Sequence, residues 1–256
     1  MACLQMSSIH DQALYNSLPS LQEANDARKA KQVDNMIGGP LRDVFFKHGL
    51  QDTYCLYLQH RHHAVKEGEA VIKVNGTAHV MGKKAVDDIA SFGNKIVPAT
   101  WMTCGGKVVP MELAVVSDGA AAPVELSSDF ITDFTSVLAE NECEGLFGID
   151  TLAPSDWAEN SIGNSSVVVT DNGKGSYDKS RFIDVAFAFN GRDSEFRAHG
   201  RCGDDHDHTK KAPAFHVHGR CGDDHDHTKK APAFHVHGRC GVDHDHTKKP
   251  APPSTQ

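Results

Sequence analysis

The C-terminal quarter of the chain is a unit of 19 residues repeated three times, and this repeat limits what that segment can fold into. Residues 196–214, 215–233 and 234–252 align without gaps, and the second unit reads FHVHGRCGDDHDHTKKAPA. Each unit has two glycines, at least one proline and a single large aromatic residue. So little apolar surface cannot offset the entropy of ordering the unit, and the period is too short for the helical repeat families. We therefore expect residues 196–256 to form a tail that is disordered without a ligand.

The residues before the tail have the composition of a folded domain. Hydrophobic residues make up 39% of the 256-residue chain, which is enough for an ordinary core. Residues 1–36 are more polar and predict a helical arm interrupted at Pro19. We therefore divide the chain into a polar N-terminal arm, 1–36, a globular domain, 37–195, and the tail, 196–256.

Local patterns in the globular domain favour hairpins over helices. Asn75-Gly76 and Gly105-Gly106 are typical of tight turns, and each lies between two runs of strand-forming residues. Apolar residues recur at helical spacing from Phe130 to Leu138, just after serines that can cap a helix. A short helix is expected over 41–48, and further strands over 54–62, 146–152, 166–170 and 182–189. These elements predict an α+β fold built on a mostly antiparallel sheet with a few helices.

Each repeat unit carries histidine and cysteine side chains of the kind and number that one metal ion needs. The first unit presents His-x2-Cys-x3-His-x-His, and zinc, nickel and copper ions all bind imidazole and thiolate. Four donors satisfy one tetrahedral ion, so the tail is expected to hold up to three. The candidate ligands are His199, Cys202, His206, His208, His218, Cys221, His225, His227, His237, Cys240, His244 and His246. The alternative is a repeat that expanded and is tolerated as a solvated tail, which the near-identity of the units suits equally well. The spacing matches no standard zinc finger, so we do not expect each unit to fold around its ion as a finger does.

A second candidate metal site lies in the globular domain. If residues 54–62 form one strand, His60 and His62 emerge on the same face, at the end of an apolar stripe. With Glu67 they give the spacing His-x-His-x4-Glu, which resembles part of the cupin metal motif. That resemblance implies a catalytic metal, although the second cupin motif is not evident. The alternative is a strand end whose histidines face an ion-paired or water-filled pocket.

Charge and cysteine content narrow the functional classes. From His199 onward the chain has nine Lys and Arg against eight Asp and Glu, and before it 17 against 26. The acidic body disfavours constitutive binding of nucleic acid. The seven cysteines are an odd number, no secretory signal is recognisable at the start, and no apolar run reaches the length of a membrane span. We therefore expect reduced thiols in a soluble, cytoplasmic protein whose protein partners are unknown.

Five phrases of the sequence resemble a group of conserved hypothetical proteins of fungi. They are LRDVFFKHGLQD, LYLQHRHH, SFGNKIVPATWM, GLFGIDTL and FRAHGRCGDDHDHT, and the similarity spans residues 37–209. The resemblance implies that one His-Gly-x-Cys-Gly-x-x-His-x-His unit is the usual ending, where this chain has three. It implies no activity and no catalytic residues.

Three functions follow as hypotheses. The first is a metal-handling protein whose tail sequesters or delivers zinc, nickel or copper ions. The second is a metal-dependent enzyme of cupin-like type, with its metal at His60 and His62. The third is an interaction module whose eleven tail histidines sense pH near their ordinary pKa of about 6.5. Metal content of the full chain and of a chain ending at Glu195 would separate the first two, provided that the truncated body stays folded, as we expect.

Overall fold

A computed structural model of the protein describes residues 10–74, 77–117, 119, 124–162, 166–171, 182–190 and 196–203. The chain divides into two units, Met1–Lys210 and Lys211–Gln256, and every described residue belongs to the first. The tail beyond Gly203 lies outside the described residues, so its expected disorder stays a prediction.

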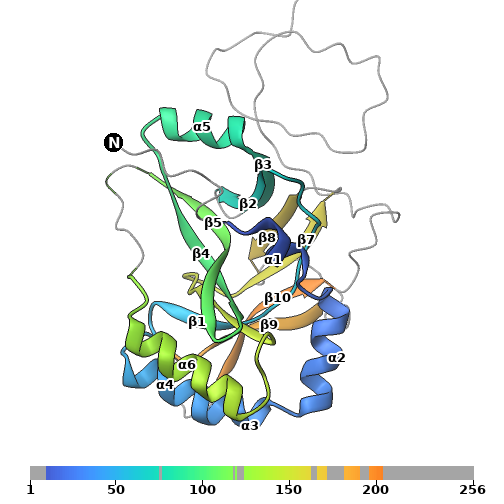
Figure 1. Cartoon of the computed structure of the whole chain (residues 1–256), viewed down its shortest axis with the longest axis vertical. Coiled ribbons are helices and arrows are strands. Elements are labelled where there is room, and N and C mark those ends of the chain that lie inside the picture. Colours follow the sequence, from blue (N-terminus) through green and yellow to red (C-terminus); the bar gives the residue numbers. More distant parts are fainter. Residues whose placement is uncertain are drawn as a thin grey trace, which may run out of the picture. The chain divides into compact units, whose positions relative to one another are not determined.

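Ten strands close into a barrel in the order β1-β6-β4-β5-β2-β3-β8-β7-β10-β9 (Figure 1). Their bounds are β1 Tyr54–Leu58, β2 Glu69–Val74, β3 Thr77–Gly82, β4 Lys95–Cys104, β5 Lys107–Val116, β6 Phe147–Thr151, β7 Trp157–Ile162, β8 Ser166–Asp171, β9 Phe182–Ala188 and β10 Arg197–Gly203. Among the described strand pairs, only β2–β5 and β7–β10 are parallel. The predicted α+β class with a mostly antiparallel sheet is confirmed.

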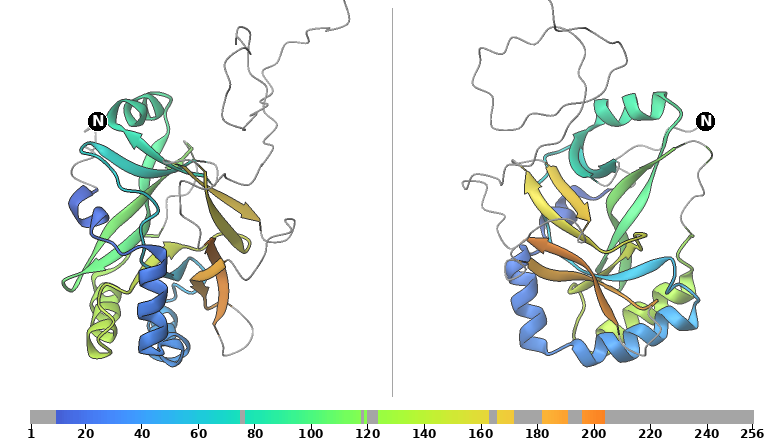
Figure 2. Two further views of the ribbon diagram at one scale, coloured as in Figure 1. Left: turned by 90° about the vertical axis from the view of Figure 1, so that its right-hand side faces the viewer. Right: turned by 180° about the vertical axis from the view of Figure 1, so that it is seen from behind.

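Helices cover parts of the outer surface of the barrel. Their bounds are α1 Gln12–Asn16, α2 Leu21–Lys31, α3 Asp34–Met36, α4 Arg42–Lys47, α5 Lys83–Ser91 and α6 Ser128–Glu140, with a π-helical turn, η2 Ile37–Leu41, before α4. The hydroxyl of Ser127 caps α6 by accepting a hydrogen bond from the backbone N–H of Phe130. α4 and α6 lie side by side at one end of the barrel, and α5 lies at the opposite end (Figure 2).

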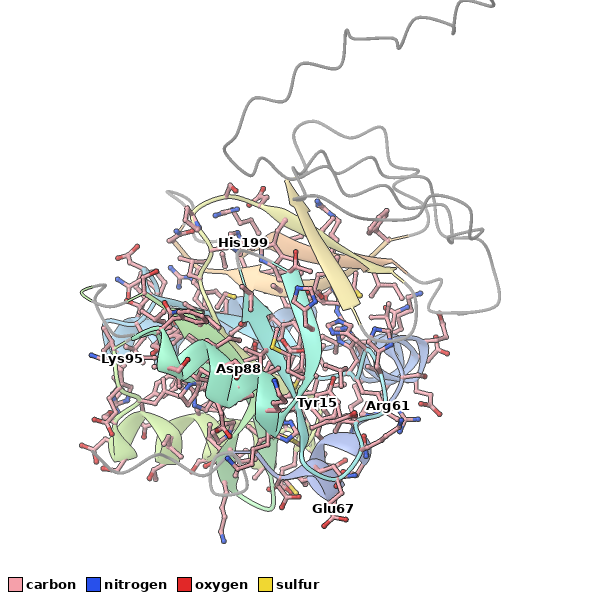
Figure 3. The ribbon with its side chains drawn as sticks, turned by 90° about the horizontal axis from the view of Figure 1, so that it is seen from above. Tyr15, Arg61, Glu67, Asp88, Lys95 and His199 are labelled. Carbon is pink, nitrogen blue, oxygen red and sulfur yellow. The ribbon has the colours of Figure 1, made fainter. Side chains whose placement is uncertain are left out.

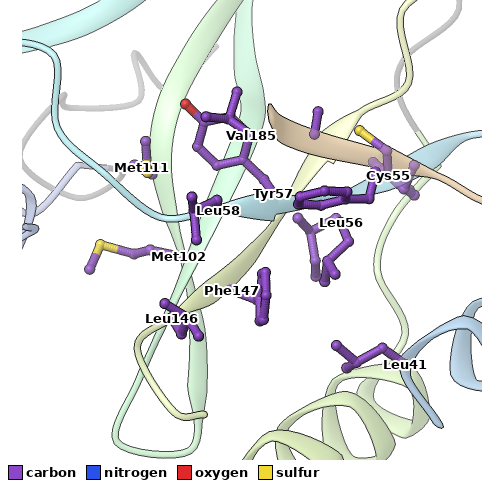
Figure 4. Packing of buried hydrophobic residues seen from close by; sticks show 14 of the residues in the cluster. Leu41, Cys55, Leu56, Tyr57, Leu58, Met102, Met111, Leu146, Phe147 and Val185 are labelled. Atoms are coloured by element: carbon purple, nitrogen blue, oxygen red, sulfur yellow. The ribbon is translucent and has the colours of Figure 1, made fainter. Parts of the chain in front are cut away.

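The main hydrophobic core lies between the barrel and the helices that cover it. Phe45 of α4 packs edge-on against Phe130 and Phe134 of α6, with ring centroids 5.3 and 6.0 Å apart. Every residue of β1 is buried, because alternate side chains of this strand point to this core and to the inside of the barrel. Figure 4 shows Leu56 on the helix side of the strand and Tyr57 on the other.

Both predicted hairpins are confirmed. β2 and β3 pair up to Val74 and Thr77, on either side of Asn75-Gly76. β4 and β5 pair up to Cys104 and Lys107. Gly105 and Gly106 both have positive φ, 54° and 70°, which is the conformation that favours glycine in a two-residue hairpin turn.

Residues 10–36 pack into the core and do not form a separate polar arm. Tyr15, Leu21 and Ala24 are buried in the same hydrophobic cluster as Phe45. The side chain of Asn16 donates a hydrogen bond to the carbonyl of Val65 (2.8 Å) and accepts one from its N–H (2.9 Å). The boundary expected at residue 36 is corrected accordingly. A few apolar residues in two short, mostly polar helices were too weak a signal for this packing.

The barrel also extends beyond residue 195, the predicted end of the globular domain. β10 comes from the first repeat unit, and it pairs with β9 on one side and with β7 on the other. A chain ending at Glu195 therefore loses a strand of the barrel. The expectation that this truncation leaves the body intact is withdrawn, because the cut opens the barrel between β7 and β9.

Candidate metal centre

Strand register gathers polar side chains on the inner face of the barrel. Residues paired directly across two strands point to the same side of the sheet, and four neighbouring strands pair Cys55 with Asp150, Asp150 with Thr100, and Thr100 with Glu112. Across the barrel, β10 and β7 pair Cys202 with Glu159. All of these residues are buried. We call them, together with Lys73, the polar interior.

Lys73 compensates the carboxylates on one side of the polar interior. Its Nζ lies 3.1 Å from Oε2 of Glu112, 3.4 Å from Oδ1 of Asp150 and 3.0 Å from Oγ1 of Thr100. The Thr100 hydroxyl in turn donates a hydrogen bond of 2.7 Å to Asp150. Buried charges are stable only when they are paired and hydrogen-bonded in this way.

The pKa values of the two carboxyl groups diverge. Burial alone would raise the pKa of Glu112, but Lys73 and His62 hold it well below its usual range. Burial raises the pKa of Asp150, and the charge of Lys73 and the hydrogen bond from Thr100 offset only part of that effect. Glu112 is therefore the carboxylate that stays ionised beside the histidines.

A compact set of metal-ligand side chains lies next to this network. One donor atom from each of His60, His62, Glu159 and Cys202 falls within 4.8 Å of the other three. Nε2 of His62 is 3.1 Å from Nε2 of His60 and 3.0 Å from Oε2 of Glu159. Donors about 2.0–2.3 Å from one tetrahedral ion are roughly 3.3–3.8 Å apart, so the set would enclose an ion if the two short contacts of His62 lengthened slightly and the more distant donors moved inward. We call these four residues the ligand cluster.

The two histidines are oriented by their second ring nitrogens. Nδ1 of His60 lies 2.8 Å from the carbonyl oxygen of Leu58. A carbonyl only accepts, so Nδ1 carries the hydrogen and the lone pair of Nε2 faces the cluster. Nδ1 of His62 lies 3.4 Å from Oε1 of Glu112, which directs its Nε2 to the same place. Both arrangements match the outer-shell contacts that hold metal-ligating histidines.

Electrostatics at the ligand cluster favour a cation. Burial alone would lower the pKa of His62, but Glu159, Cys202 and Glu112 raise it well above its usual range. Burial raises the pKa of the Cys202 thiol to about 11, despite the neighbouring His62. Protons therefore occupy the site at neutral pH, at positions where a bound metal ion would replace them.

The structure revises how the histidines of the first candidate site come together. β1 ends at Leu58, so His60 and His62 lie in the following loop and not on a strand face. Their rings still meet, edge to face, with centroids 4.8 Å apart. Glu67 is exposed at the periphery of the molecule (Figure 3) and is not part of the ligand cluster, so the His-x-His-x4-Glu reading is corrected at its third position.

The structure separates two of the four candidate ligands of the first repeat unit, His199 and Cys202. Nδ1 of His199 lies 3.0 Å from Oδ1 of Asp156, and His199 is absent from the cluster that contains Cys202. His206 and His208 lie outside the described residues, as do the candidate ligands of the second and third units. Metal binding by those residues stays a prediction.

Glu159 is the member of the ligand cluster that the sequence did not predict. It lies on β7, a strand that was not predicted, and it comes beside Cys202 only through the parallel pairing of β7 with β10. The only sequence signal was an acidic residue two positions after Trp157, which is consistent with one face of a strand.

No family model, curated protein or solved structure matches this chain. Within the part of the chain that the structure describes, no helix is both long and apolar enough to cross a membrane.

Proposed function

We propose that the barrel binds a transition-metal ion, with Zn²⁺ as the first candidate, through His60, His62, Glu159 and Cys202. The single observation behind this proposal is that four buried donor atoms lie within 4.8 Å of one another. They come from one loop and two strands that are distant in sequence. Two imidazoles, a carboxylate and a thiolate suit zinc, and nickel or copper ions less specifically, whereas the thiolate disfavours calcium and magnesium.

The donor set favours retention of the ion over catalysis. Catalytic zinc sites usually have three protein ligands and leave one position open for water or substrate, whereas four protein ligands close a tetrahedral site. All four residues are also buried. The proposal is therefore a metal-binding protein in which the ion stabilises the barrel or is sequestered there. Zinc binding by the repeat units is a separate hypothesis.

Metal stoichiometry of full-length variants tests this site even if the tail binds ions of its own. The full chain is stripped with a chelator, titrated with zinc sulfate at pH 7.5, and analysed for bound metal after gel filtration. Glu159→Gln keeps the shape of the side chain and removes the charge of one ligand. We expect this variant to bind one ion fewer per chain than the wild type, or to bind it at least tenfold more weakly.

Two further variants complete the test. His60→Ala removes a second ligand and should cause the same loss, while His79→Ala, which changes a half-buried histidine on β3, should bind as many ions as the wild type. Circular dichroism confirms that each variant is folded before it is titrated. Wild-type stoichiometry and affinity in folded Glu159→Gln and His60→Ala would reject the site.

A further inference from the structure

The strand β10 has two further copies of its sequence in the same chain. Residues 196–203 read FRAHGRCG, and residues 215–222 and 234–241 both read FHVHGRCG. The copies differ from β10 only at the positions of Arg197 and Ala198. Arg197 is exposed and Ala198 is half-buried.

Most of the contacts that hold β10 use the positions that are repeated; the exceptions are the ion pair of Arg197 with Asp156 and its hydrogen bond to Asn190, at a position where the other two units have histidine. Phe196 packs edge-on against Phe187, with ring centroids 5.6 Å apart. Arg201 Nε donates a hydrogen bond of 2.7 Å to Asp184 of β9. His199 contacts Asp156 and Cys202 joins the ligand cluster, as described above. Each of these four side chains has an identical counterpart in the second and third units.

The contact at Gly200, in the middle of β10, restricts most strongly which residue can occupy its position. Gly200 lies against the indole of Trp157, and a Cβ at this position would overlap the ring. Any segment that fills the place between β7 and β9 therefore needs glycine here. Gly219 and Gly238 satisfy this condition in the other two units.

We propose that the position between β7 and β9 is a binding site for the motif Phe-x-x-His-Gly-Arg-Cys-Gly, and that the second repeat unit of the same chain can replace the first in it. Exchange costs little because it changes mainly the length of one connection and the contacts of Arg197, whose ion pair with Asp156 is exposed and therefore weak. Eight residues separate β9 from β10, and use of the second or third unit adds 19 or 38 residues. The loop-closure relation then disfavours the second unit by about sixfold and the third by about fourteenfold. No metal is needed for this exchange, so it can fail or succeed independently of the metal site.

Glycine-to-valine variants of the full chain test the exchange. Gly200→Val blocks the first unit, Gly219→Val/Gly238→Val blocks the other two, and the triple variant blocks all three. We expect Gly200→Val to unfold cooperatively, with a folding equilibrium constant about sixfold below that of the wild type. The double variant should match the wild type, and the triple variant should lose the cooperative transition. Destabilisation of Gly200→Val as severe as that of the triple variant would overturn the proposal.

Thiol protection identifies which unit fills the site. Iodoacetamide is applied to the native proteins in the presence of a chelator, with the exposed Cys104 as the reactive control. Chymotryptic cleavage after Phe196, Phe215 and Phe234 yields three different peptides for the three repeat cysteines. In the wild type the buried Cys202 should be protected; in Gly200→Val the protection should pass to Cys221.

Two results would contradict the assignment. Continued protection of Cys202 in Gly200→Val would show that the strand tolerates valine and that no exchange occurs. A concentration-dependent dimer of Gly200→Val in size-exclusion chromatography would show that the replacement strand comes from a second copy, which would overturn the intrachain form of the proposal.

Discussion

Replacement of Lys73 by Met tests whether the polar interior is held by charge compensation. Nζ of Lys73 lies 3.1 Å from a Glu112 oxygen and 3.4 Å from an Asp150 oxygen. At an effective dielectric constant of about 20, each contact provides roughly 5 kcal/mol of Coulomb attraction, and much of that offsets the desolvation of the three groups. The variant keeps the desolvation of the carboxyl groups and loses the attraction. Removal of one partner of a buried pair costs about 3–5 kcal/mol, which is the expected loss in the free energy of unfolding.

Urea denaturation at pH 7, followed by far-UV circular dichroism, measures this loss. In thermal unfolding the same change corresponds to a fall in Tm of about 6–20 °C for a domain of this size. Because Lys73 helps to hold the pKa of Glu112 below its usual range, that carboxylate stabilises the wild type above its ordinary pKa and ceases to do so in acid. In the variant the pKa of Glu112 rises, so this carboxyl group takes up a proton as the pH falls and no longer has an uncompensated charge. The difference in the free energy of unfolding between wild type and variant should therefore shrink from pH 7 to pH 5.

The matched control is Lys84→Met. Lys84 pairs with Asp88 one helical turn away, at 2.9 Å, but both side chains are exposed, so the change should stay within about 0.5 kcal/mol. A loss below about 1 kcal/mol in Lys73→Met, or an equal loss in Lys84→Met, would refute the argument that the interior depends on this cation.

Three further predictions concern the interior. The Tyr57 hydroxyl is buried and has no hydrogen-bond partner among the described residues, so Tyr57→Phe should leave the free energy of unfolding within about 1 kcal/mol of the wild type, and a larger loss in urea denaturation would reveal a partner. A Cβ at Gly148 would overlap the Trp101 carbonyl, so Gly148→Ala should lower stability by more than about 2 kcal/mol, whereas Gly82→Ala, which meets open space, should not. Zinc binding between pH 6 and 7 should release about two protons, one from His62 and one from Cys202, and should strengthen as pH rises; calorimetry in buffers of different ionisation enthalpy would contradict this if it found no release.

The hairpins and α6 could be predicted because their signals are local. Asn75-Gly76 and Gly105-Gly106 are turn sequences that can be recognised on their own, and the cap at Ser127 and the spacing from Phe130 to Leu138 define one amphipathic helix. Each signal needs only the residues of the element itself. The mostly antiparallel sheet followed from these hairpins.

The closure of the barrel and the ligand cluster could not be predicted, because they depend on pairings between distant segments. Glycines made 196–203 look like part of a disordered tail, although Gly200 is required by the contact with Trp157. The sequence predicts Cys202 as a candidate ligand but groups it with its neighbours in sequence, since nothing local connects it with Glu159. His60 and His62 were recognised as a pair, and their rings do meet, although through a loop and not through strand alternation.

Glu112 connects Lys73 with His62 of the ligand cluster. This connection predicts that zinc affinity depends on Glu112, although Glu112 is not one of the four proposed ligands. One of its oxygens lies 3.1 Å from Lys73 and the other 3.4 Å from Nδ1 of His62. If Nε2 of His62 binds the ion, Nδ1 must donate its hydrogen elsewhere, and an ionised carboxylate fixes the ring better than a neutral amide.

Glu112→Gln keeps the size of the side chain and removes this charge, so zinc affinity should fall about 10- to 100-fold. Competition with a chromophoric chelator measures the change. Glu69→Gln is the control, because Glu69 only accepts a surface hydrogen bond of 2.9 Å from the backbone of Lys66. Wild-type affinity in Glu112→Gln would mean that the carboxylate does not orient His62. In that case the Glu112 carboxylate would only neutralise the charges of Lys73 and of a protonated His62. Metal binding would then have to depend on the four residues of the ligand cluster alone.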